Sequence, residues 1–98
     1  MSDIDELQAK AIEFRDKRNW QRFHNPKDLS ISICIEAAEL LELFQWNDGN
    51  EVSKERMGEE IADIFIYLLS LADVTEIDIP QAVMNKIEKN KLKYPLED

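Results

Sequence analysis

Apolar residues recur at intervals of three and four positions along most of this chain, which is the period of a helix that buries one side. The pattern predicts four helices, over residues 3–19, 26–46, 54–74 and 79–92. In the first helix the apolar side carries Ile4, Leu7, Ala11 and Phe14, together with the stem of Arg18. No alternating strand pattern competes, so the sequence predicts an all-α fold with short connections.

Capping residues stand at the starts of the predicted helices. Asn25 is followed by a proline, in the order typical of an N-cap and a first helical residue. Ser53 is placed to cap the third helix, and Asp78 and Gln81 have the spacing of a capping box. The run Asn-Asp-Gly-Asn at 47–50 is a strong stop and turn signal after the second helix.

The composition is that of one folded domain over residues 1–98, with 44% hydrophobic and 34% charged residues. The formal net charge of −9 argues against a nucleic-acid polymer as the partner, because phosphate backbones are bound by basic surfaces. A small phosphate ligand is still compatible with this charge, since a bound cation can invert the local field.

Cysteine content and hydropathy bear on location. Cys34 is the only cysteine, so no disulfide forms within the chain, which suits a reducing cytoplasm. Its place in an apolar helix predicts a small core residue. The first ten residues are acidic and polar, unlike a signal peptide, and no apolar run approaches the roughly 18 residues that span a bilayer. We therefore expect a cytoplasmic protein without a membrane partner.

Three glutamates interrupt the apolar pattern of the second helix, in the stretch CIEAAELLELFQW over residues 34–46. At about 100° per residue, Glu36 falls amid the apolar stripe and Glu39 lies beside it. Glu42 drifts towards the other edge, where a solvated side chain is expected. Charged groups are seldom buried unless they are paired or hold a metal, so Glu36 and Glu39 are candidates for a functional site.

The third helix repeats this arrangement, with Glu60 in the apolar stripe and Asp63 three residues on. If these two helices form an antiparallel hairpin, the two acidic pairs face each other. Four carboxylates at that distance cannot all stay ionised without a cation, and oxygen-only ligands select Mg²⁺ or Mn²⁺. The alternative is a solvated face, which is the usual interpretation of one such pair alone. A di-iron site uses Glu-x-x-His pairs, and the one histidine, His24, lies outside both motifs.

The two acidic motifs, Glu36-Ala-Ala-Glu39 and Glu60-Ile-Ala-Asp63, resemble the ExxE…ExxD pattern of the MazG-like all-α nucleoside triphosphate pyrophosphohydrolases. That pattern alone is loose. Further segments resemble the dCTP pyrophosphatase-like branch, and the combined set is specific. They are Trp20-Gln-Arg-Phe23-His24, ELFQW, Asp63-Ile-Phe-Ile-Tyr67, Asp78-Ile-Pro80-Gln-Ala82 and Asn90-Lys-Leu-Lys-Tyr94-Pro95.

The resemblance implies a four-helix MazG-like bundle, assembled as a dimer or a dimer of dimers, and the reaction NTP + H₂O → NMP + PPi. Attack would fall on the α-phosphorus, with dCTP or a related or modified dNTP as substrate. The implied cofactor is Mg²⁺, with Mn²⁺ as a possible substitute. By position the metal ligands would be Glu36, Glu39, Glu60 and Asp63. Glu36 and Glu39 are the implied catalytic residues, and Glu39 is the one expected to orient or deprotonate the attacking water.

The substrate-binding residues expected from these matches are Trp20, His24, Trp46, Tyr67, Lys86, Asn90, Lys93 and Tyr94. The lysines suit phosphate oxygens, the tryptophans can stack on a base, and Tyr67 can touch the sugar. All of them except Tyr67 have a plainer alternative. The residues near the C-terminus can be a solvated basic face, the tryptophans can be core or interface residues, and His24 can make a hydrogen bond at the start of the second helix.

Two classes of function compete at this point: the pyrophosphohydrolase, and a non-catalytic helical module that assembles through apolar stripes. Acids embedded in core-facing stripes destabilise such a module if they are buried unpaired, which favours the enzyme. The third helix is apolar on most sides from Ile61 to Ala72, more than one small domain can cover. We therefore expect a homo-oligomer, either a dimer or a tetramer.

Overall fold

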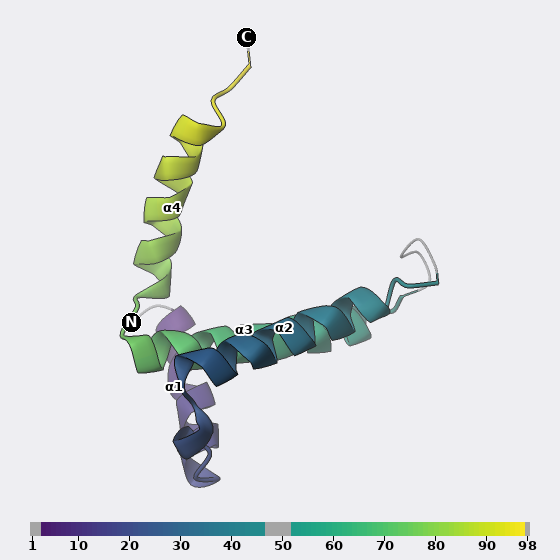
Figure 1. Cartoon of the computed structure of the whole chain (residues 1–98), viewed down its shortest axis with the longest axis vertical. Coiled ribbons are helices and arrows are strands. Elements are labelled where there is room, and N and C mark those ends of the chain that lie inside the picture. Colours follow the sequence, from purple (N-terminus) through teal and green to yellow (C-terminus); the bar gives the residue numbers. More distant parts are fainter. Residues whose placement is uncertain (1–2, 47–51, 98) are drawn as a thin grey trace.

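The structure is a computed structural model that describes residues 3–46 and 52–97. This part of the chain holds four α-helices and no strand (Figure 1). They are α1 (Asp3–Lys17), α2 (Pro26–Glu42), α3 (Lys54–Thr75) and α4 (Ile79–Lys93), and a short 3₁₀ helix, η1 (Gln21–Phe23), lies between α1 and α2. The predicted all-α fold of four helices is confirmed. None of the described helices combines the length and the apolar character that crossing a membrane requires.

The predicted N-caps form. The side chains that accept a hydrogen bond from the backbone N–H three residues on, at 2.8, 3.1 and 3.0 Å, are those of Asn25, Ser53 and Asp78. The capping box at Asp78 is half formed, because the side-chain amide of Gln81 donates to Asn85 at 2.9 Å instead of returning to the cap.

Two helices end earlier than predicted. α1 stops at Lys17, and Asn19 then takes a left-handed backbone conformation with φ 55°. α2 ends at Glu42 and continues as tight turns through Trp46, in which backbone N–H groups bond carbonyls three residues back. The turn signal at 47–50 lies outside the described residues. At the other end of the hairpin, α3 closes where Glu76 adopts φ 57°.

The helices pack around α3. α2 runs antiparallel along it as a hairpin and α1 crosses it, with Leu29 and Leu69, each 2% exposed, at the centre. α4 projects from the hairpin and has at most marginal contact with the other described helices (Figure 1). The radius of gyration is accordingly 16.2 Å, against about 13 Å for a compact chain of about 100 residues.

Two expectations about side chains change. Cys34 is exposed, so the prediction of a core residue is wrong within one chain. The reason is that α2 turns its Glu36 side towards α3, and Cys34 lies about 160° away on the helix. On α1 the buried basic residue is Arg15, at 8% exposure, whereas Arg18 is exposed with its guanidinium 3.5 Å from the centroid of the Phe14 ring.

Candidate metal and nucleotide site

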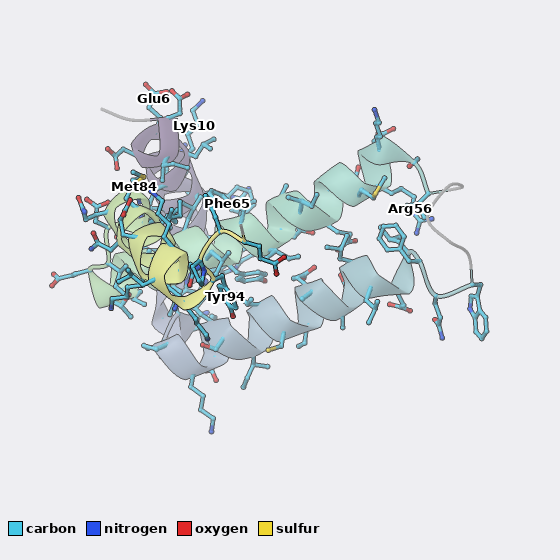
Figure 2. The ribbon with its side chains drawn as sticks, turned by 90° about the horizontal axis from the view of Figure 1, so that it is seen from above. Glu6, Lys10, Arg56, Phe65, Met84 and Tyr94 are labelled. Carbon is cyan, nitrogen blue, oxygen red and sulfur yellow. The ribbon has the colours of Figure 1, made fainter. Side chains whose placement is uncertain are left out.

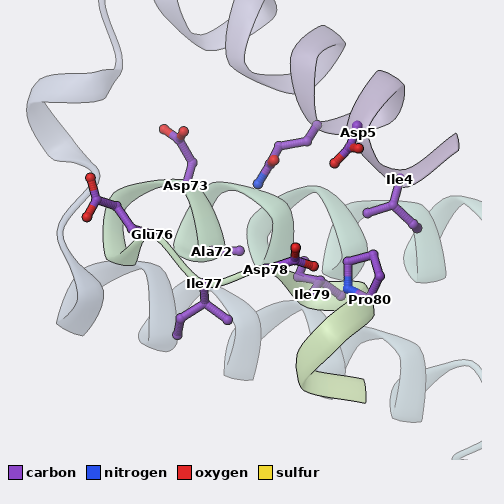
Figure 3. Close-up of a pocket in the computed structure, with 10 residues that line it drawn as sticks. Ile4, Asp5, Ala72, Asp73, Glu76, Ile77, Asp78, Ile79 and Pro80 are labelled. Atoms are coloured by element: carbon purple, nitrogen blue, oxygen red, sulfur yellow. The ribbon is translucent and has the colours of Figure 1, made fainter. Parts of the chain in front are cut away.

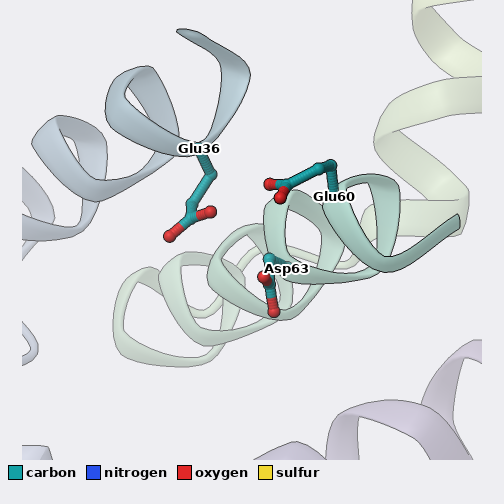
Figure 4. A group of neighbouring side chains, drawn as sticks. All are labelled: Glu36, Glu60 and Asp63. Carbon is teal, nitrogen blue, oxygen red and sulfur yellow. The ribbon is translucent and has the colours of Figure 1, made fainter. Parts of the chain in front are cut away.

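Three carboxylates meet between α2 and α3. Glu36 projects from α2, and Glu60 and Asp63 project from α3 towards it (Figure 4). One oxygen of each lies within 4.8 Å of the others. We call these three residues the carboxylate cluster. It arises because each acid shares its helix face with the apolar residues that hold the hairpin together.

Burial and mutual repulsion govern the ionisation of the cluster. The Oε2 atoms of Glu36 and Glu60 are buried and have no hydrogen-bond partner. Burial, and then the neighbouring carboxylates, raise the pKa of Glu36 to about 7. Burial and the charges of Glu39 and Asp63 raise the pKa of Glu60 as well. The two glutamates are therefore not fully ionised near neutral pH unless a cation binds between them.

Glu39 stands at the edge of the cluster. It is exposed and lies outside the three oxygens that converge, yet its charge contributes to the raised pKa of both Glu36 and Glu60. Glu42 is exposed, as expected. The structure thus separates the three glutamates of α2 into one inside the cluster, one beside it and one in solvent.

The donor set of the cluster suits a hard divalent cation. All its candidate ligand atoms are carboxylate oxygens, and one oxygen of Glu36 and one of Glu60 are buried without a partner. Ion pairs between described residues lie elsewhere, as in Arg15–Asp16, Arg15–Asp73, Lys17–Glu13 and Lys91–Glu88. No basic side chain in the described ranges therefore neutralises these acids, and a bound cation would.

A pocket of about 730 Å³ opens beside the cluster, between α1, the turn at η1 and α3. We call it the α1–α3 pocket. Three of the predicted substrate-binding residues line it, namely Trp20, His24 and Tyr67, and so does Asp63 of the cluster. Its remaining wall is largely apolar, with Leu7, Phe14 and Ile66. An apolar pocket with a few polar groups next to a cation site has the form of a small-molecule site.

His24 is half-buried in this pocket, and its Nδ1 has no hydrogen-bond partner. Burial, and then the positive charge of Arg15, lower the pKa of its imidazole, so the ring is neutral at pH 7. The hydrogen bond that caps α2 is made by Asn25. The imidazole of this pocket-lining residue therefore has one nitrogen that is buried and without a hydrogen-bond partner.

The other predicted substrate-binding residues are not gathered there in one chain. Trp46 is 88% exposed after the end of α2 and does not line the α1–α3 pocket. Lys86, Asn90 and Lys93 lie on α4, which projects away from the hairpin (Figure 1), and Tyr94 directly follows that helix. Asn90 is half-buried and the other three are exposed.

Sequence reasoning missed an ion pair next to the pocket. Nη1 of Arg15 lies 3.0 Å from Oδ2 of Asp73, and Nε lies 3.0 Å from Oδ1 of Asp16. Arg15 lines the α1–α3 pocket together with His24. A signal was present, since Arg15 follows Ala11 by four residues and so continues the apolar side of the first helix.

A second cavity, of about 360 Å³, lies where α1 begins, α3 ends and α4 begins (Figure 3). Asp73, Glu76 and Asp78 line it together with apolar residues such as Ile4 and Ile77. None of the predicted site residues lines this cavity, so it is separate from the candidate site.

Comparison with known proteins agrees with this geometry. Residues 31–98 match the MazG-like family. The chain belongs to the MazG-like family. Residues 31–98 of this MazG-like chain contain the carboxylate cluster and α4, whereas Trp20 and His24 precede the matched range. The resemblance inferred from the acidic motifs is confirmed.

Similar proteins extend the match over nearly the whole MazG-like chain. dCTP pyrophosphatase 1 of Mus musculus is 39% identical over 104 residues, which cover 98% of this chain and 59% of that protein. The Homo sapiens protein of the same name is 38% identical, with 97% and 59% covered. The chain thus spans about three fifths of the length of these relatives. The crystal structure of a pyrophosphatase from Archaeoglobus fulgidus superposes with a TM-score of 0.90 at 48% identity, covering 98% of this chain and 95% of that one.

Proposed function

We propose that this MazG-like chain is a metal-dependent (d)NTP pyrophosphohydrolase, which cleaves the α–β anhydride to give (d)NMP and pyrophosphate. The observation that carries the proposal is the carboxylate cluster, with two buried and unpartnered oxygens, directly beside the apolar α1–α3 pocket. The similarity to proteins named dCTP pyrophosphatase 1 supports the same reaction class.

The proposed cofactor is Mg²⁺, with Mn²⁺ as a possible substitute, because the ligands are all oxygens. Glu36, Glu60 and Asp63 would hold it, with Glu39 at the edge. A bound divalent cation supplies charge stabilisation on the phosphoryl oxygens and lowers the pKa of coordinated water. It would also relieve the repulsion that raises the pKa of Glu36.

Glu39 is the proposed general base. It is exposed and lies outside the converging oxygens, so its carboxylate can accept a proton while the three acids of the cluster hold the cation. The water oxygen forms a bond to the α-phosphorus as its proton passes to Glu39. The bond between the α-phosphorus and the bridging oxygen then breaks, and pyrophosphate leaves with the bonding electrons. Glu36 would act from inside the cluster, as a ligand of the cation that positions the reacting groups.

The nucleoside is proposed to lie in the α1–α3 pocket. The Trp20 ring offers a flat surface for stacking, Tyr67 lies one turn beyond Asp63 and can contact the sugar, and His24 can hydrogen-bond the base or sugar through its unpartnered Nδ1. We propose dCTP or a related or modified dNTP as the substrate, and house-cleaning of the nucleotide pool as the role. A free thiol at Cys34 fits the cytoplasm as the site of this reaction.

We further propose that the protein is a homo-oligomer. Apolar side chains of α4 are open to solvent within one chain, with Val83 50% and Met84 58% exposed (Figure 2 labels Met84). Ile35 on α2 and Ile61 on α3 are similarly open, at 52% and 56%. Surfaces of this kind are covered in solution by another protein surface, and a second copy is the partner that is always present.

The competing function, a non-catalytic interaction module, accounts for the exposed apolar faces. It does not account for two buried carboxylate oxygens without partners, which weaken a purely structural hairpin. The enzyme explains both features, because its site needs the acids and its assembly needs the apolar faces.

The test is pyrophosphate release from a panel of dNTPs, with Mg²⁺, with Mn²⁺ and with EDTA. We expect release with either cation and none with EDTA. Absence of turnover of every nucleotide in a folded, metal-loaded sample would exclude the enzyme. Gel filtration of the same sample reports the oligomeric state, and a monomer at micromolar concentration would contradict the oligomer.

A further inference from the structure

We propose that Arg15 is a positioning residue for nucleotide binding, because its bond to Asp73 of α3 holds the connection that carries Trp20 and His24. The proposal rests on the proposed function, which places the nucleoside against that connection. Arg15 acts on the substrate through the connection, so its loss should weaken binding and leave the chemical step unchanged.

The part of the pocket wall that needs to be held lies outside the α-helices. The α1–α3 pocket is lined by α1, by α3 and by the connection of residues 18–25 that leads from α1 to α2. Trp20 and His24 flank η1 in this connection, and Trp20 is 45% exposed. Connecting segments are less constrained than helices, so the position of these two residues depends on the bonds that tie the connection down.

The side chain of Arg15 joins α1 to α3 beside this wall. Its Nη1 donates to Oδ2 of Asp73, in the last turn of α3 (Figure 3), and its Nε donates to Oδ1 of Asp16, each at 3.0 Å. Burial disfavours the charge of the guanidinium, but the two carboxylates outweigh burial and raise its pKa. Arg15 is thus a charged anchor that is only 8% exposed.

The backbone of Arg15 connects this anchor to the pocket wall. Its carbonyl oxygen accepts the N–H of Trp20 at 3.1 Å. The carbonyl of Trp20 in turn accepts the N–H of Phe23 at 2.9 Å. The carbonyl of Gln21 accepts the N–H of His24 at 3.0 Å. Short backbone bonds therefore lead from Arg15 to both pocket-lining residues of the connection.

The planar guanidinium suits this role. One of its nitrogens bonds Asp16, the next residue of α1, while another bonds Asp73 on the helix that α1 crosses. A lysine has one ammonium group on a flexible stem, so it can keep the charge but not both directed bonds. The conservative variant Arg15→Lys should therefore restore part of the binding that is lost in Arg15→Met.

A second bond joins the same two helices and supplies a matched control. Nε2 of Gln8 donates to the carbonyl oxygen of Leu69 at 3.0 Å. Gln8 precedes Arg15 by seven residues, about 10 Å along α1, and does not line the α1–α3 pocket. Its loss weakens the contact of α1 with α3 without releasing the connection. Variants of Gln8 and Arg15 therefore distinguish a bond that only stabilises the fold from one that positions the wall.

Steady-state kinetics with dCTP and Mg²⁺ make this distinction. We expect Arg15→Met to raise KM about tenfold with kcat little changed, as loss of ground-state binding does, and Arg15→Lys to raise KM less. Gln8→Met should keep the wild-type KM. The assays are run at a temperature at which circular dichroism shows every variant folded. A wild-type KM in Arg15→Met, or an equal rise in Gln8→Met, overturns the proposal.

The variant Asp73→Ala tests the same bond from its other partner. Alanine removes the acceptor at a half-buried helical position and favours the helix, so this variant should fold even if Arg15→Met does not. We expect it to raise KM with kcat little changed, as Arg15→Met does. An unchanged KM in Asp73→Ala overturns the proposal, because Arg15 would then hold the wall without its anchor.

A double-mutant cycle tests whether Arg15 acts through the connection. The background variant Trp20→Ala/His24→Ala removes both side chains of the wall. If Arg15 only positions them, Arg15→Met should lower kcat/KM less than about twofold in this background, against about tenfold in the wild type. Equal losses in the two backgrounds overturn the proposal, since Arg15 would then act independently of the wall.

Acrylamide quenching of tryptophan fluorescence follows the connection without any turnover. The chain has two tryptophans, so Trp20 is the only one left in a Trp46→Phe background. We expect Arg15→Met to raise the quenching constant about twofold, because a ring now 45% exposed is released into solvent, and Gln8→Met to leave it unchanged. Equal constants in all three proteins overturn the proposal. Failure of the wild type to hydrolyse any dNTP would remove the proposed function and leave the quenching result standing.

Discussion

The guanidinium of Arg15 reaches from α1 to α3, where its Nη1 lies 3.0 Å from Oδ2 of Asp73. Arg15 is 8% exposed, and its backbone carbonyl accepts the N–H of Trp20 at 3.1 Å. One residue therefore fixes α1 against α3 with its side chain and holds the following turn with its backbone. That turn presents Trp20 and His24 to the α1–α3 pocket.

Replacing Arg15 with methionine should lower the free energy of unfolding by about 2 kcal/mol, because Asp73 loses a charged hydrogen-bond donor in a half-buried position. Urea denaturation with an unchanged m-value measures this loss. The control is Lys17→Met, which breaks an exposed ion pair with Glu13 and should cost less than about 0.5 kcal/mol. Equal losses in both variants would show that the Arg15–Asp73 pair contributes no more to the free energy of unfolding than an exposed ion pair.

Local features of the fold were predictable from the sequence, because local physics decides them. The caps at Asn25, Ser53 and Asp78 depend on one side chain and the N–H three residues on, and all three form. The approach of Glu36 to Glu60 follows from helical periodicity and the antiparallel packing of neighbouring helices. These parts need no knowledge of how distant segments meet.

Features that depend on contacts between segments far apart in the sequence could not be predicted from local patterns. Arg15 and Asp73 are far apart in sequence, and only the crossing of α1 over α3 joins them. Cys34 sits in an apolar helix, but its side of α2 is left uncovered. The position of α4 depends on the turn around Glu76 and on what its apolar side contacts. The sequence could therefore assign the predicted substrate residues to this helix, but not their position relative to the carboxylate cluster.

Glu60→Gln should abolish turnover while leaving the fold intact. The change removes a metal ligand, and loss of one group that stabilises charge costs on the order of 10²-fold or more in rate. In EDTA its melting temperature should equal or exceed that of the wild type, because burial and neighbouring acids already raise the pKa of Glu60 and disfavour its charge. Thermal unfolding and pyrophosphate release measure the two effects. An unfolded variant would instead make Glu60 a structural residue.

The metal-free protein should lose stability from Glu36 as the pH rises from about 4.5 to about 7. The pKa of Glu36 is raised in the folded state to about 7 from its ordinary 4.5, so in this window the folded state binds more protons than the unfolded state. The stabilisation from protonated Glu36 is fully present below the pKa of the unfolded state. It is lost as the pH rises through the pKa of the folded state. Urea denaturation in EDTA at pH 5 and pH 7.5 measures the change.

Comparison with Glu36→Gln isolates this contribution. The lowered pKa of His24 acts in the opposite direction, since stability from a buried neutral imidazole grows as the pH rises towards its ordinary pKa. Both proteins share that effect, so the difference between them reports Glu36. Identical pH profiles for the two proteins would contradict the raised pKa. Added Mg²⁺ should flatten the fall in the wild type, because a bound cation favours the ionised carboxylate.

Filling the α1–α3 pocket should weaken substrate binding without touching the acids. Ala62 lines the pocket on α3, and a leucine there occupies space proposed for the nucleoside. We expect Ala62→Leu to raise KM about tenfold with kcat little changed, as loss of ground-state binding does. The control is Ala9→Leu, on an exposed part of α1 outside the pocket lining, with no expected effect. Steady-state kinetics with dCTP and Mg²⁺ decide the matter: an unchanged KM in Ala62→Leu would place the nucleoside outside this pocket.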